Sequence, residues 1–570
     1  MVGCAQAVIA MNPRGRVTRS EWRWLAAWIA VAMLVTSVPY AIGLARSSPD
    51  RIFGGSVFAV EDVNSYLAKM REGASGEWLF HIVYTSEPHE GALLFLFHLL
   101  LGKLAVLIGL PLEVMYHAAR IVLGAFLLVV TYRFTAMITG SIAIRRIAFL
   151  LVTFGGGLGW ALMAAGQPNW LGSPPLDLIS PEGFTFLVLY AMPHIALARS
   201  LMLLGLIWLW TPSARRDWQV GLAVGGSWAG MALIVPFYVV VTYAIVFGAL
   251  CASSLVRRRI AWDLTRRAMV ACATCAIFPL YTLAVLAANP VFSEWSRQNQ
   301  IVSPHPAHYL LAYGVGGGLA LASLRWAWRR NATWHYLIGW LIVIPLLVYA
   351  PLGIQRRLIE GWQLPLSLLA AATLVRRVLP AVRRSHPARW LARFPRYTTA
   401  GVQRWALCGL LLLMIPTYGL LLFDQALRAA TGQPPMFRDG GEIAALDWLS
   451  TRATYQDVVL AAYPTGNYLP ARVPARSFVG HGPETIHLEA KRSLVAQFYS
   501  TSTSDAWRET FLRQWAITFV FVGPAERDLG QADLSSTPYL EVWYSARGYQ
   551  IYRVSEDSVS TDALYCRMSE

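Results

Sequence analysis

The stretch WRWLAAWIAVAMLVTSVPYAIGL, residues 22–44, is the first long apolar run of the chain. An α-helix needs roughly 20 apolar residues to cross the hydrocarbon core of a bilayer, and this run is long enough. Arginines precede or begin it, namely Arg14, Arg16, Arg19 and Arg23. Because basic residues stay on the cytoplasmic side of spans, we expect a cytoplasmic N-terminus. A cleaved signal peptide is the alternative, but the length, the lack of a clear small-residue cleavage site and the later spans favour an uncleaved anchor.

The composition agrees with a membrane protein. The chain has 570 residues, of which 56% are hydrophobic and 14% charged, with a mean hydropathy of +0.45. These values exclude an ordinary soluble or disordered chain, where about a quarter of residues are charged. The net charge is +16, but residues 425–570 carry 13 basic and 16 acidic residues against 35 and 16 before them. The positive excess therefore accompanies the apolar part, which favours a multi-pass membrane protein over a nucleic-acid binder.

Ten further runs of suitable length bring the expected total to about eleven transmembrane helices. They cover residues 114–133, 144–165, 194–210, 220–234, 236–255, 269–287, 309–324, 334–352, 362–379 and 405–423. Arginine clusters fall in alternate loops between them, which places those loops inside. The last span then leads out, so residues 425–570 are expected on the extracytoplasmic side.

One apolar run, from Gly91 to Ile108, does not fit this alternation. It is apolar enough to span, but a span here would reverse the side of every later loop, and it contains His98 and Lys103. We therefore predict a surface-lying or re-entrant helix. Residues 46–113 then form one large extracytoplasmic loop within a membrane domain that covers residues 1–424.

Residues 425–570 are expected to form a separate α/β domain. Helical patterns cover 441–449 and 484–498, strand patterns cover 457–462 and 518–522, and 540–544 with 549–554 reads as a hairpin. Within it, Gly480-His481-Gly482-Pro483-Glu484-Thr485 predicts a turn before a helix rather than a site. Lysine is almost absent from the whole chain, which has three: Lys69, Lys103 and Lys491.

Two adjacent acids follow the first span. Glu61 and Asp62 begin an aromatic-bearing helical pattern in the large loop. Such a pair could supply a general base and a group that orients metal or substrate. The alternative is a solvated pair that stabilises the positive end of the helix dipole, and the dipeptide alone favours it.

Two arginines lie in a loop that we expect on the extracytoplasmic side, whereas the arginine clusters of the other loops are expected on the cytoplasmic side. Gln355, Arg356 and Arg357 lie between two spans whose other ends are flanked by cytoplasmic arginines. Guanidinium groups retained there suggest an anionic partner such as a lipid phosphate. A headgroup anchor, or a salt bridge with Glu360, is an equal alternative.

Ionisable residues near the outer ends of spans form a further set of candidates. Arg120 and Arg199, with His117 and His194, either contribute to a site or pair with other residues to lock helices together. Carboxylates and imidazoles from separate outward loops could hold a divalent metal, Mg or Mn. The candidates are Asp177, Glu87, His305 and His308.

The whole arrangement resembles the C-type glycosyltransferase superfamily (GT-C), which includes protein O-mannosyltransferases, aminoarabinose transferases and oligosaccharyltransferases. The segment from Gly109 to Arg120, ending in Ala118-Ala119-Arg120, is similar to the entry into the second span of the mannosyltransferase-like branch. Glu87-Pro88 lies where these proteins often carry an acid-Pro or Lys-Pro element. The resemblance covers most of the chain, but its motifs are short.

The resemblance implies an inverting enzyme that moves a sugar from a polyprenyl-phosphate donor to an extracytoplasmic acceptor: a glycan, a lipid or a protein. It assigns the catalytic base to Asp62, with Glu61 as the alternative because the Glu-Asp order departs from the family pattern. Glu182 or Asp177 matches the second-loop acid by location, and Arg356 and Arg357 match the donor-phosphate ligands. The competing functions are a transporter or flippase for a lipid-linked glycan and a non-enzymatic envelope assembly protein.

Overall fold

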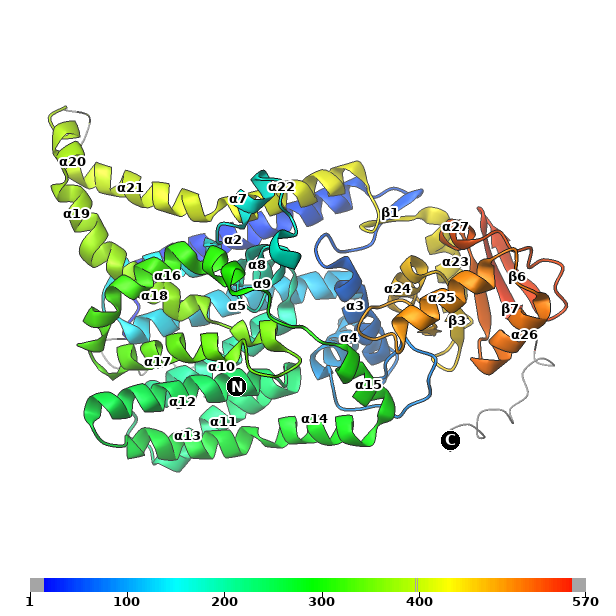
Figure 1. Cartoon of the computed structure of the whole chain (residues 1–570), viewed down its shortest axis with the longest axis horizontal. Helices are drawn as coiled ribbons and strands as arrows, with labels where there is room; N and C mark the ends of the chain where they lie inside the picture. Colours follow the sequence, from blue (N-terminus) through cyan, green and yellow to red (C-terminus); the bar gives the residue numbers. More distant parts are fainter. Residues whose placement is uncertain (1–14, 395, 397, 556–570) are drawn as a thin grey trace. The chain divides into compact units, whose positions relative to one another are not determined.

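The computed structural model describes residues 15–394, 396 and 398–555 (Figure 1). Arg14, which was counted in the basic N-terminal flank, and residues 556–570 of the tail lie outside the described residues. The chain divides into two compact units. The first comprises Met1–Ser37, Ala119–Tyr281 and Ile301–Asp424, and the second comprises Val38–Ala118, Thr282–Gln300 and Gln425–Glu570.

Most of the first unit consists of long apolar helices. In the part of the chain that the structure describes, eight helical segments are long and apolar enough to cross a membrane. They are α2 (Arg19–Arg46), α5 (Leu112–Ile138), α6–α7 (Ile142–Ala164), α10 (Pro193–Trp210), α12 (Tyr238–Arg257), α13–α14 (Trp262–Ala288), α16 (Pro306–Trp328) and η3 through α19 (Gln355–Arg384). A ninth arises if α21 (Thr399–Met414) and α22 (Pro416–Thr431), bent by 51°, form one span. The chain is thus a multi-pass helical membrane protein, as predicted.

All eleven predicted runs lie on helices. Two of them fall on α11 (Asp217–Ile234) and α17 (Ala332–Leu347), which are not among the eight. At 1.5 Å per residue, the 16-residue α17 reaches about 24 Å, short of a hydrocarbon core of about 30 Å. Both helices still belong to the bundle, because α11 packs on α10 and α13, and α17 packs on α12.

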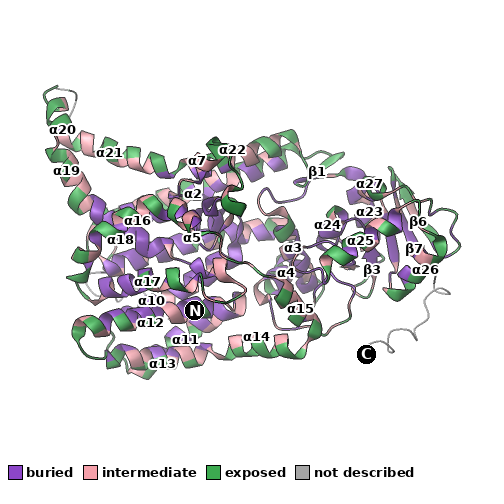
Figure 2. Ribbon diagram, in the orientation of Figure 1, coloured by how far each residue is buried: buried purple, intermediate pink, exposed green. Residues whose placement is uncertain are grey.

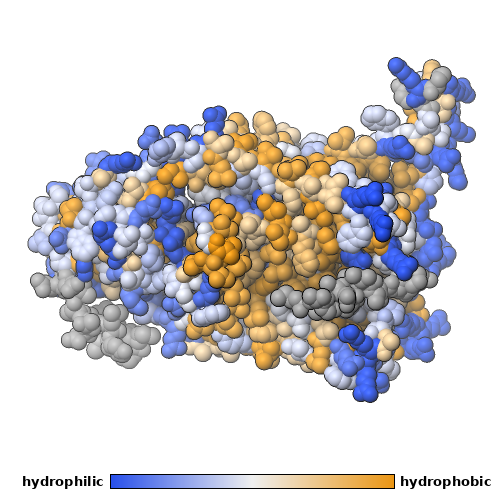
Figure 3. Space-filling model, turned by 180° about the vertical axis from the view of Figure 1, so that it is seen from behind, coloured by the Kyte–Doolittle hydropathy of each residue, from blue (hydrophilic) through white to orange (hydrophobic). Residues whose placement is uncertain are grey.

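The helix α18 (Gln363–Thr373) is buried along its whole length (Figure 2). On the face that Figure 3 shows, hydrophobic residues form a broad band over the helices. Leu255, Leu310 and Leu346, for example, are exposed. Apolar side chains that face outward this widely are expected where lipid replaces water as the solvent.

Short elements connect the spans of this unit. They are η2 (Trp170–Gly172), α8 (Leu176–Ile179), α9 (Thr185–Ala191) and α20 (His386–Leu391), whereas η3 (Gln355–Ile359), η4 (Leu374–Val378) and α19 (Leu379–Arg384) are parts of the Gln355–Arg384 segment itself. α6 (Ile142–Phe154) and α7 (Gly159–Ala164) are separated by a break, as α13 (Trp262–Cys275) is from α14 (Ile277–Ala288). Buried positions dominate α9 and α18, whereas α19 has none.

The second unit begins with the residues of the predicted large loop. α3 (Val60–Ala74) packs on α4 (Leu96–Ile108), and α15 (Pro290–Gln298) adds Phe292 to a core with Phe80 and Leu99. α4 has 13 residues and therefore spans about 20 Å, which is too short to cross a bilayer. The prediction that this run does not span is consistent with this length; its place at a membrane surface stays a prediction.

The tail residues of this unit form a five-stranded sheet in the order β4-β3-β5-β7-β6. β3 pairs in parallel with β4 and β5, while β7 pairs antiparallel with β5 and β6, so the sheet is mixed. A separate two-stranded ribbon joins β1 (Arg51–Phe53) of the large loop to β2 (Phe437–Asp439). The predicted α/β character of the tail is thus confirmed.

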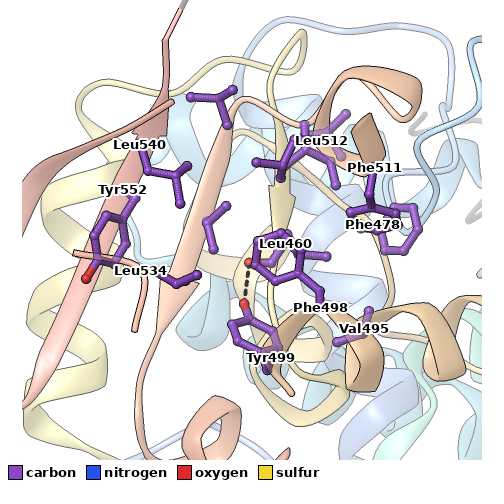
Figure 4. Packing of buried hydrophobic residues seen from close by; sticks show 14 of the residues in the cluster. Leu460, Phe478, Val495, Phe498, Tyr499, Phe511, Leu512, Leu534, Leu540 and Tyr552 are labelled. Atoms are coloured by element: carbon purple, nitrogen blue, oxygen red, sulfur yellow. Dashed lines mark hydrogen bonds between the residues drawn. The ribbon is translucent and has the colours of Figure 1, made fainter. Parts of the chain in front are cut away.

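Both faces of the sheet are covered by hydrophobic clusters. Successive residues of a strand point to opposite faces, so one strand contributes to both clusters. Val458 and Leu460 of β3 face one hydrophobic cluster, and Val459 faces the other. Figure 4 shows the first cluster, where the Tyr499 hydroxyl donates a hydrogen bond to the carbonyl of Leu460 at 3.2 Å.

Helices and short strands follow one another along the tail. In chain order they are α23 (Gly440–Ser450), β3 (Val458–Leu460), α24 (Tyr463–Arg472), β4 (Arg476–Ser477), α25 (Leu488–Tyr499), α26 (Asp505–Gln514), β5 (Phe519–Val522), α27 (Pro524–Leu529), β6 (Leu540–Ala546) and β7 (Tyr549–Val554). The second predicted helix starts at Leu488 rather than at Glu484. The reason is that residues of α3 hold the side chain of Glu484, while its backbone forms a turn.

Candidate active site

The two adjacent acids occupy the first turn of α3. Ala59, just before them, has a left-handed backbone (φ 48°), and its carbonyl accepts from the Val63 N–H, so the helix starts abruptly here. Both acidic residues are exposed, and 51% of the Asp62 side chain is accessible. Carboxylates at this helix end are stabilised by the dipole, but their exposure also leaves them available to a substrate.

Different tail residues contact the two acids within the second unit. The Tyr463 hydroxyl donates to Glu61 Oε2 at 3.0 Å, and burial together with the negative charge of Glu61 raises the pKa of Tyr463 to about 12. His481 Nε2 lies 3.4 Å from Asp62 Oδ1. Only 6% of the His481 side chain is exposed, so a buried imidazole contacts a half-exposed carboxylate.

A buried ion pair supports His481 from the other side. Glu484 Oε1 lies 2.7 Å from Lys69 Nζ, accepts from the Ser65 hydroxyl at 2.9 Å, and is 3.8 Å from His481 Nδ1. Burial alone would raise the pKa of Glu484, but Lys69 and His481 outweigh it and hold that pKa below its ordinary value. Glu484 is therefore a fixed anion in the interior of this unit.

The turn that carries His481 is held rigidly. The Thr485 hydroxyl accepts from the backbone N–H groups of Gly480 and His481 at 3.1 and 3.2 Å. The Tyr84 ring lies against the imidazole, with centroids 5.4 Å apart. The prediction of a turn at residues 480–485 is confirmed, but the expectation that it is no more than a turn missed its contact with Asp62.

Glu182 and Arg357, two predicted site residues, come together in the first unit. Arg357 Nε lies 3.7 Å from Glu182 Oε1, and the Arg357 guanidinium lies 5.7 Å from the Phe237 ring centroid. Glu182 is buried, whereas 30% of the Arg357 side chain is exposed. A guanidinium held on one side and open on the other can accept an anionic ligand.

The two residues before Arg357, Gln355 and Arg356, differ in the hydrogen bonds that they make. Gln355 is structural, because its side chain accepts from the Ser303 N–H at 3.0 Å and donates to the Ala350 carbonyl at 2.9 Å. The half-buried Arg356 has a buried Nε that donates no hydrogen bond to the described residues. An arginine with a donor that makes no hydrogen bond is a better candidate for phosphate binding than the glutamine beside it.

Arg199 uses its hydrogen-bond donors within the protein. Its Nε and one terminal nitrogen bind Glu360, the latter at 2.8 Å, and the same terminal nitrogen donates to the carbonyl of Glu182 at 2.9 Å. Tyr238 also donates to Glu360. The pairing alternative therefore describes Arg199, and Glu360 is the partner of Arg199 rather than of Arg356 or Arg357.

Arg120 is likewise held by the helices around it. It donates to the Leu189 carbonyl at 3.2 Å and to the Ser37 hydroxyl at 2.8 Å, and 2% of it is exposed. These contacts join α2, α5 and α9 through one guanidinium. A role of Arg120 or Arg199 toward a phosphate would have to be indirect, through the backbone that they hold in place.

The metal candidates already have protein partners. Glu87 lies 2.6 Å from Lys491 Nζ, His305 accepts from the Ala307 N–H, and His308 contacts the carbonyl of Trp170 at 2.7 Å. Asp177 accepts from three donors: the N–H groups of Gly157 and Gly159 and the hydroxyl of Thr417. Among the described residues, no three His, Cys, Asp or Glu side chains form a group that could hold a metal. These residues do not fit a Mg or Mn site, and no step is assigned to a metal.

The acid at position 177 instead organises the break between α6 and α7. Burial raises the pKa of Asp177, against the opposing effect of the Thr417 hydroxyl and the two backbone donors. Its Oδ1 is buried and receives no hydrogen bond from the described residues. An apolar setting disfavours the charged form of a carboxyl, which is the cause of the raised pKa.

The residues that the sequence analysis did not assign to the site are His481, Glu484, Lys69 and Tyr463, and it considered Glu360 only as a salt-bridge partner of Arg356 or Arg357. Two signals pointed toward part of this set. Two of the three lysines in the chain, Lys69 and Lys491, are buried in ion pairs, so a rare residue type marked special positions. A histidine between two glycines is the other signal, since the flanking glycines let other backbone approach closely.

Comparison with known proteins identifies the fold. No protein-family profile matches the sequence, and no curated protein matches it. The structure has the fold of the GT-C glycosyltransferases, a class of multi-pass membrane enzymes, which confirms the resemblance at the level of the fold.

Two solved structures illustrate the likeness. One is the oligosaccharyltransferase of Archaeoglobus fulgidus tethered to an acceptor peptide, with a TM-score of 0.50 and 11% identity, covering 95% of this chain and 75% of that chain. The other is the arabinofuranosyltransferase AftD from Mycobacteria, with a TM-score of 0.50 and 17% identity. The match covers 95% of this chain but 40% of the AftD chain, so this protein spans less than half of that relative.

Proposed function

We propose that the protein is a membrane glycosyltransferase that moves a sugar from a polyprenyl-phosphate donor to an acceptor hydroxyl or amide. The observation that carries this proposal is the GT-C fold combined with a half-exposed Asp62 that a buried histidine contacts. The two similar proteins named above are an oligosaccharyltransferase and an arabinofuranosyltransferase. Both names describe transfer of sugar units, which favours the same reaction class here.

Asp62 is the proposed general base, and Glu61 has a supporting role. Asp62 takes the proton of the acceptor while the acceptor atom attacks the anomeric carbon of the sugar. The bond from that carbon to the phosphate oxygen breaks, the phosphate keeps the electron pair, and the configuration inverts. The geometry favours Asp62 because the neighbouring Glu61 is already engaged by the Tyr463 hydroxyl.

Arg356 and Arg357 are the proposed ligands of the departing phosphate. A guanidinium offers several donors in a fixed plane that match phosphate oxygens, and charge stabilisation of the leaving group lowers the barrier. Glu182 holds Arg357 in place, and Gln355 fixes the turn that presents both arginines. Arg120 and Arg199 contribute indirectly, by fixing the helices and the carbonyl at Glu182.

The proposed location is the bacterial cytoplasmic membrane, with the N-terminus inside. The loop 46–113 of the membrane domain 1–424 and the domain 425–570 would both lie on the extracytoplasmic side. Arginine clusters in alternate loops support this orientation. Membrane lipids, a polyprenyl-phosphate-linked sugar and a glycan, lipid or protein acceptor are the expected partners, and no nucleic acid is expected.

Transfer of labelled sugar from a panel of polyprenyl-phosphate donors tests the proposal, with the purified full-length protein in membranes. Asp62→Asn is expected to lower the rate on the order of 10²- to 10⁴-fold, and Arg356→Ala on the order of 10²-fold. The exposed Glu77→Gln and Arg215→Ala serve as matched controls and should retain the wild-type rate.

Three outcomes would contradict this assignment. If both variants match the wild type with every donor that works, the residues are wrong. If the labelled lipid crosses the membrane with its sugar still attached and no donor loses its sugar, the protein is a transporter or flippase. Absence of both transfer and translocation would favour the envelope assembly protein.

A further inference from the structure

The link between two candidate spans of the first unit carries an unusual charge. Residues 385–398 join the span that ends at Arg384 to the bent pair α21–α22. The sequence has no aspartate or glutamate from position 361 to 423, but it has eight arginines from 376 to 404. We call residues 376–404 the basic arm.

All eight arginines of the basic arm are exposed, and most of them are unpaired. Arg376 lies over the Trp326 ring, 4.4 Å from its centroid, and Arg377 donates to the Ala322 carbonyl at 2.7 Å. The side chains of the other six make no hydrogen bond or ion pair with the residues that the structure describes. These six are Arg383, Arg384, Arg389, Arg393, Arg396 and Arg404.

Arginines in other parts of the first unit have acidic partners instead. Arg267 Nε lies 2.7 Å from Asp217, and an Arg145 terminal nitrogen lies 3.0 Å from Glu21. The basic arm has no acid of its own to neutralise it. Its positive charge is therefore available to a partner outside the chain.

The basic arm is an ordered helical hairpin. α19, α20 and α21 pack on one another, and the Gln403 side chain donates to the Leu379 carbonyl at 2.7 Å. The Ser385 hydroxyl accepts from the Ala388 N–H at 3.4 Å and so caps α20. In Figure 1, α19 and α20 project from the helices of this unit and α21 runs back toward them. The arginines are thus presented on a defined scaffold.

Aromatic side chains lie among the arginines. Trp390 and Phe394 are 49% and 47% exposed, and their ring centroids are 5.2 Å apart. Backbone hydrogen bonds from Arg393 to Trp390 and from Phe394 to Leu391 continue the turn beyond α20. Residues four apart are neighbours on such a turn, so Trp390 with Phe394 and Arg389 with Arg393 form adjacent rows. Aromatic and basic side chains side by side are typical of helices that lie at a membrane surface.

We propose that the basic arm binds the headgroups of anionic phospholipids, in the leaflet where the two spans end. Guanidinium groups pair with lipid phosphates, and the rings of Trp390 and Phe394 lie at the level of the headgroups. Because both ends of the hairpin continue into candidate spans, its base stays at the membrane surface. This inference does not depend on the proposed function.

The charge of the arm selects the class of lipid. A zwitterionic headgroup carries a cation of its own beside the phosphate, so a surface made of such lipids has no net charge to attract the arginines. A surface of net negative charge attracts each basic residue near it. The arm is therefore expected to distinguish anionic from zwitterionic lipids.

Hydrogen exchange of the backbone amides of residues 379–404 tests this proposal. The full-length protein is placed in nanodiscs of phosphatidylcholine, alone or mixed with phosphatidylglycerol. We expect exchange in the arm to be slower by at least about tenfold in the anionic discs, because headgroup binding opposes its local opening. The difference should shrink as the salt concentration rises.

Variants at four exposed positions connect this effect to the arginines. Glutamine at these positions should abolish the difference between the discs, whereas lysine, which keeps the charge, should retain most of it; the positions are Arg383, Arg384, Arg389 and Arg393. The control replaces four exposed arginines of other loops by glutamine and should leave the difference intact; these are Arg215, Arg258, Arg259 and Arg266.

Three results would overturn the proposal. The first is equal exchange of the wild-type arm in both kinds of disc, and the second is an equal loss of the difference in the control variant. The third is protection of the arm by soluble polyglutamate but not by phosphatidylglycerol, which would identify an acidic protein as the partner instead. Sugar transfer is not a readout here, so the outcome is independent of the transferase assay.

Discussion

Lys69 and Glu484 form an ion pair of 2.7 Å, although 415 residues separate them in the chain. The two side chains are 1% and 6% exposed, so the pair lies in the interior of the second unit. It joins the large loop after the first span to the turn that carries His481. The position of His481 against Asp62 therefore depends on an interaction that hydropathy and local pattern do not reveal.

Lys69→Met should destabilise this unit. It leaves Glu484 buried without its counter-charge, and removal of one partner of a buried pair costs about 3–5 kcal/mol. The free energy of unfolding of the second unit, measured by denaturant titration with a local probe, reports this loss. Lys103→Met is the control, because Lys103 donates to the Gly76 carbonyl in an exposed setting. Equal stability of the two variants would contradict the role of the buried pair.

Glu182→Gln should act through Arg357. The carboxylate lies 3.7 Å from the guanidinium and keeps it in place, so its loss is expected to raise the KM for the lipid-linked donor more than it lowers kcat. Arg357→Gln should produce the larger loss, and the double variant should be little worse than Arg357→Gln alone. The exposed pair Glu294 and Arg297 provides a control cycle. Additive effects of Glu182→Gln and Arg357→Gln would show that the two act independently.

Glu72 should make stability depend on pH. Burial raises its pKa from an ordinary 4.5 to about 7, despite the opposing hydrogen bonds from His81. The folded state therefore binds more protons than the unfolded state between pH 4.5 and 7, and stability falls as the pH rises through this window. The full effect is roughly 3 kcal/mol at about 1.36 kcal/mol per unit.

Glu72→Gln should remove this dependence. Its amide oxygen can still accept from the His81 N–H, which is 3.0 Å from Glu72 Oε1. We expect the variant to unfold at a higher denaturant concentration than the wild type at about pH 8 and at a similar one at about pH 4. Glu77→Gln, on the exposed side of the same region, should change neither value. A variant less stable than the wild type above neutral pH would show that the carboxylate is favourable when charged.

Gly102→Ala should separate α3 from α4. A Cβ at Gly102 would lie 1.8 Å from the Met70 carbonyl oxygen, and one at Gly73 would lie 2.0 Å from that of Leu99, so the two backbones touch. Overpacking of this kind typically costs about 1–3 kcal/mol. Gly226→Ala is the control, because no other part of the described chain lies within 4 Å of its added methyl group. Thermal unfolding measures both, and an unchanged Gly102→Ala midpoint would disprove the close packing.

Several parts of the fold could be predicted from the sequence because they depend on local chemistry. Transfer into lipid is a property of each apolar segment, so all eleven predicted runs lie on helices, including α11 and α17. The hairpin of β6 and β7 followed from alternation and turn residues. The short α4 was expected not to cross because charge bias and Lys103 opposed a span.

The candidate site was predictable only in its separate pieces. Glu182 with Arg357, and the acid at position 62, were chosen from their placement in loops. The pairings of these and other ionisable residues were not predicted. Glu360 pairs with Arg199, which lies 161 residues away in the sequence, and His481 contacts Asp62, which lies 419 residues away. Pairing between distant segments depends on tertiary packing, and one chain without its fold contains no local signal for it.

The sequence by itself determined a multi-pass helical membrane protein with an α/β tail, and it located the acids and arginines from which a site could be built. Hydrophobic transfer and charge bias act residue by residue, so composition and order are sufficient for those conclusions. Tertiary structure alone decided that Tyr463 donates to Glu61 while His481 contacts Asp62. It also decided that Arg199 pairs with Glu360, whereas the Nε of Arg356 makes no hydrogen bond to the described residues. These distinctions depend on which groups meet at hydrogen-bonding distance, and a distance between remote residues exists only once the chain has folded.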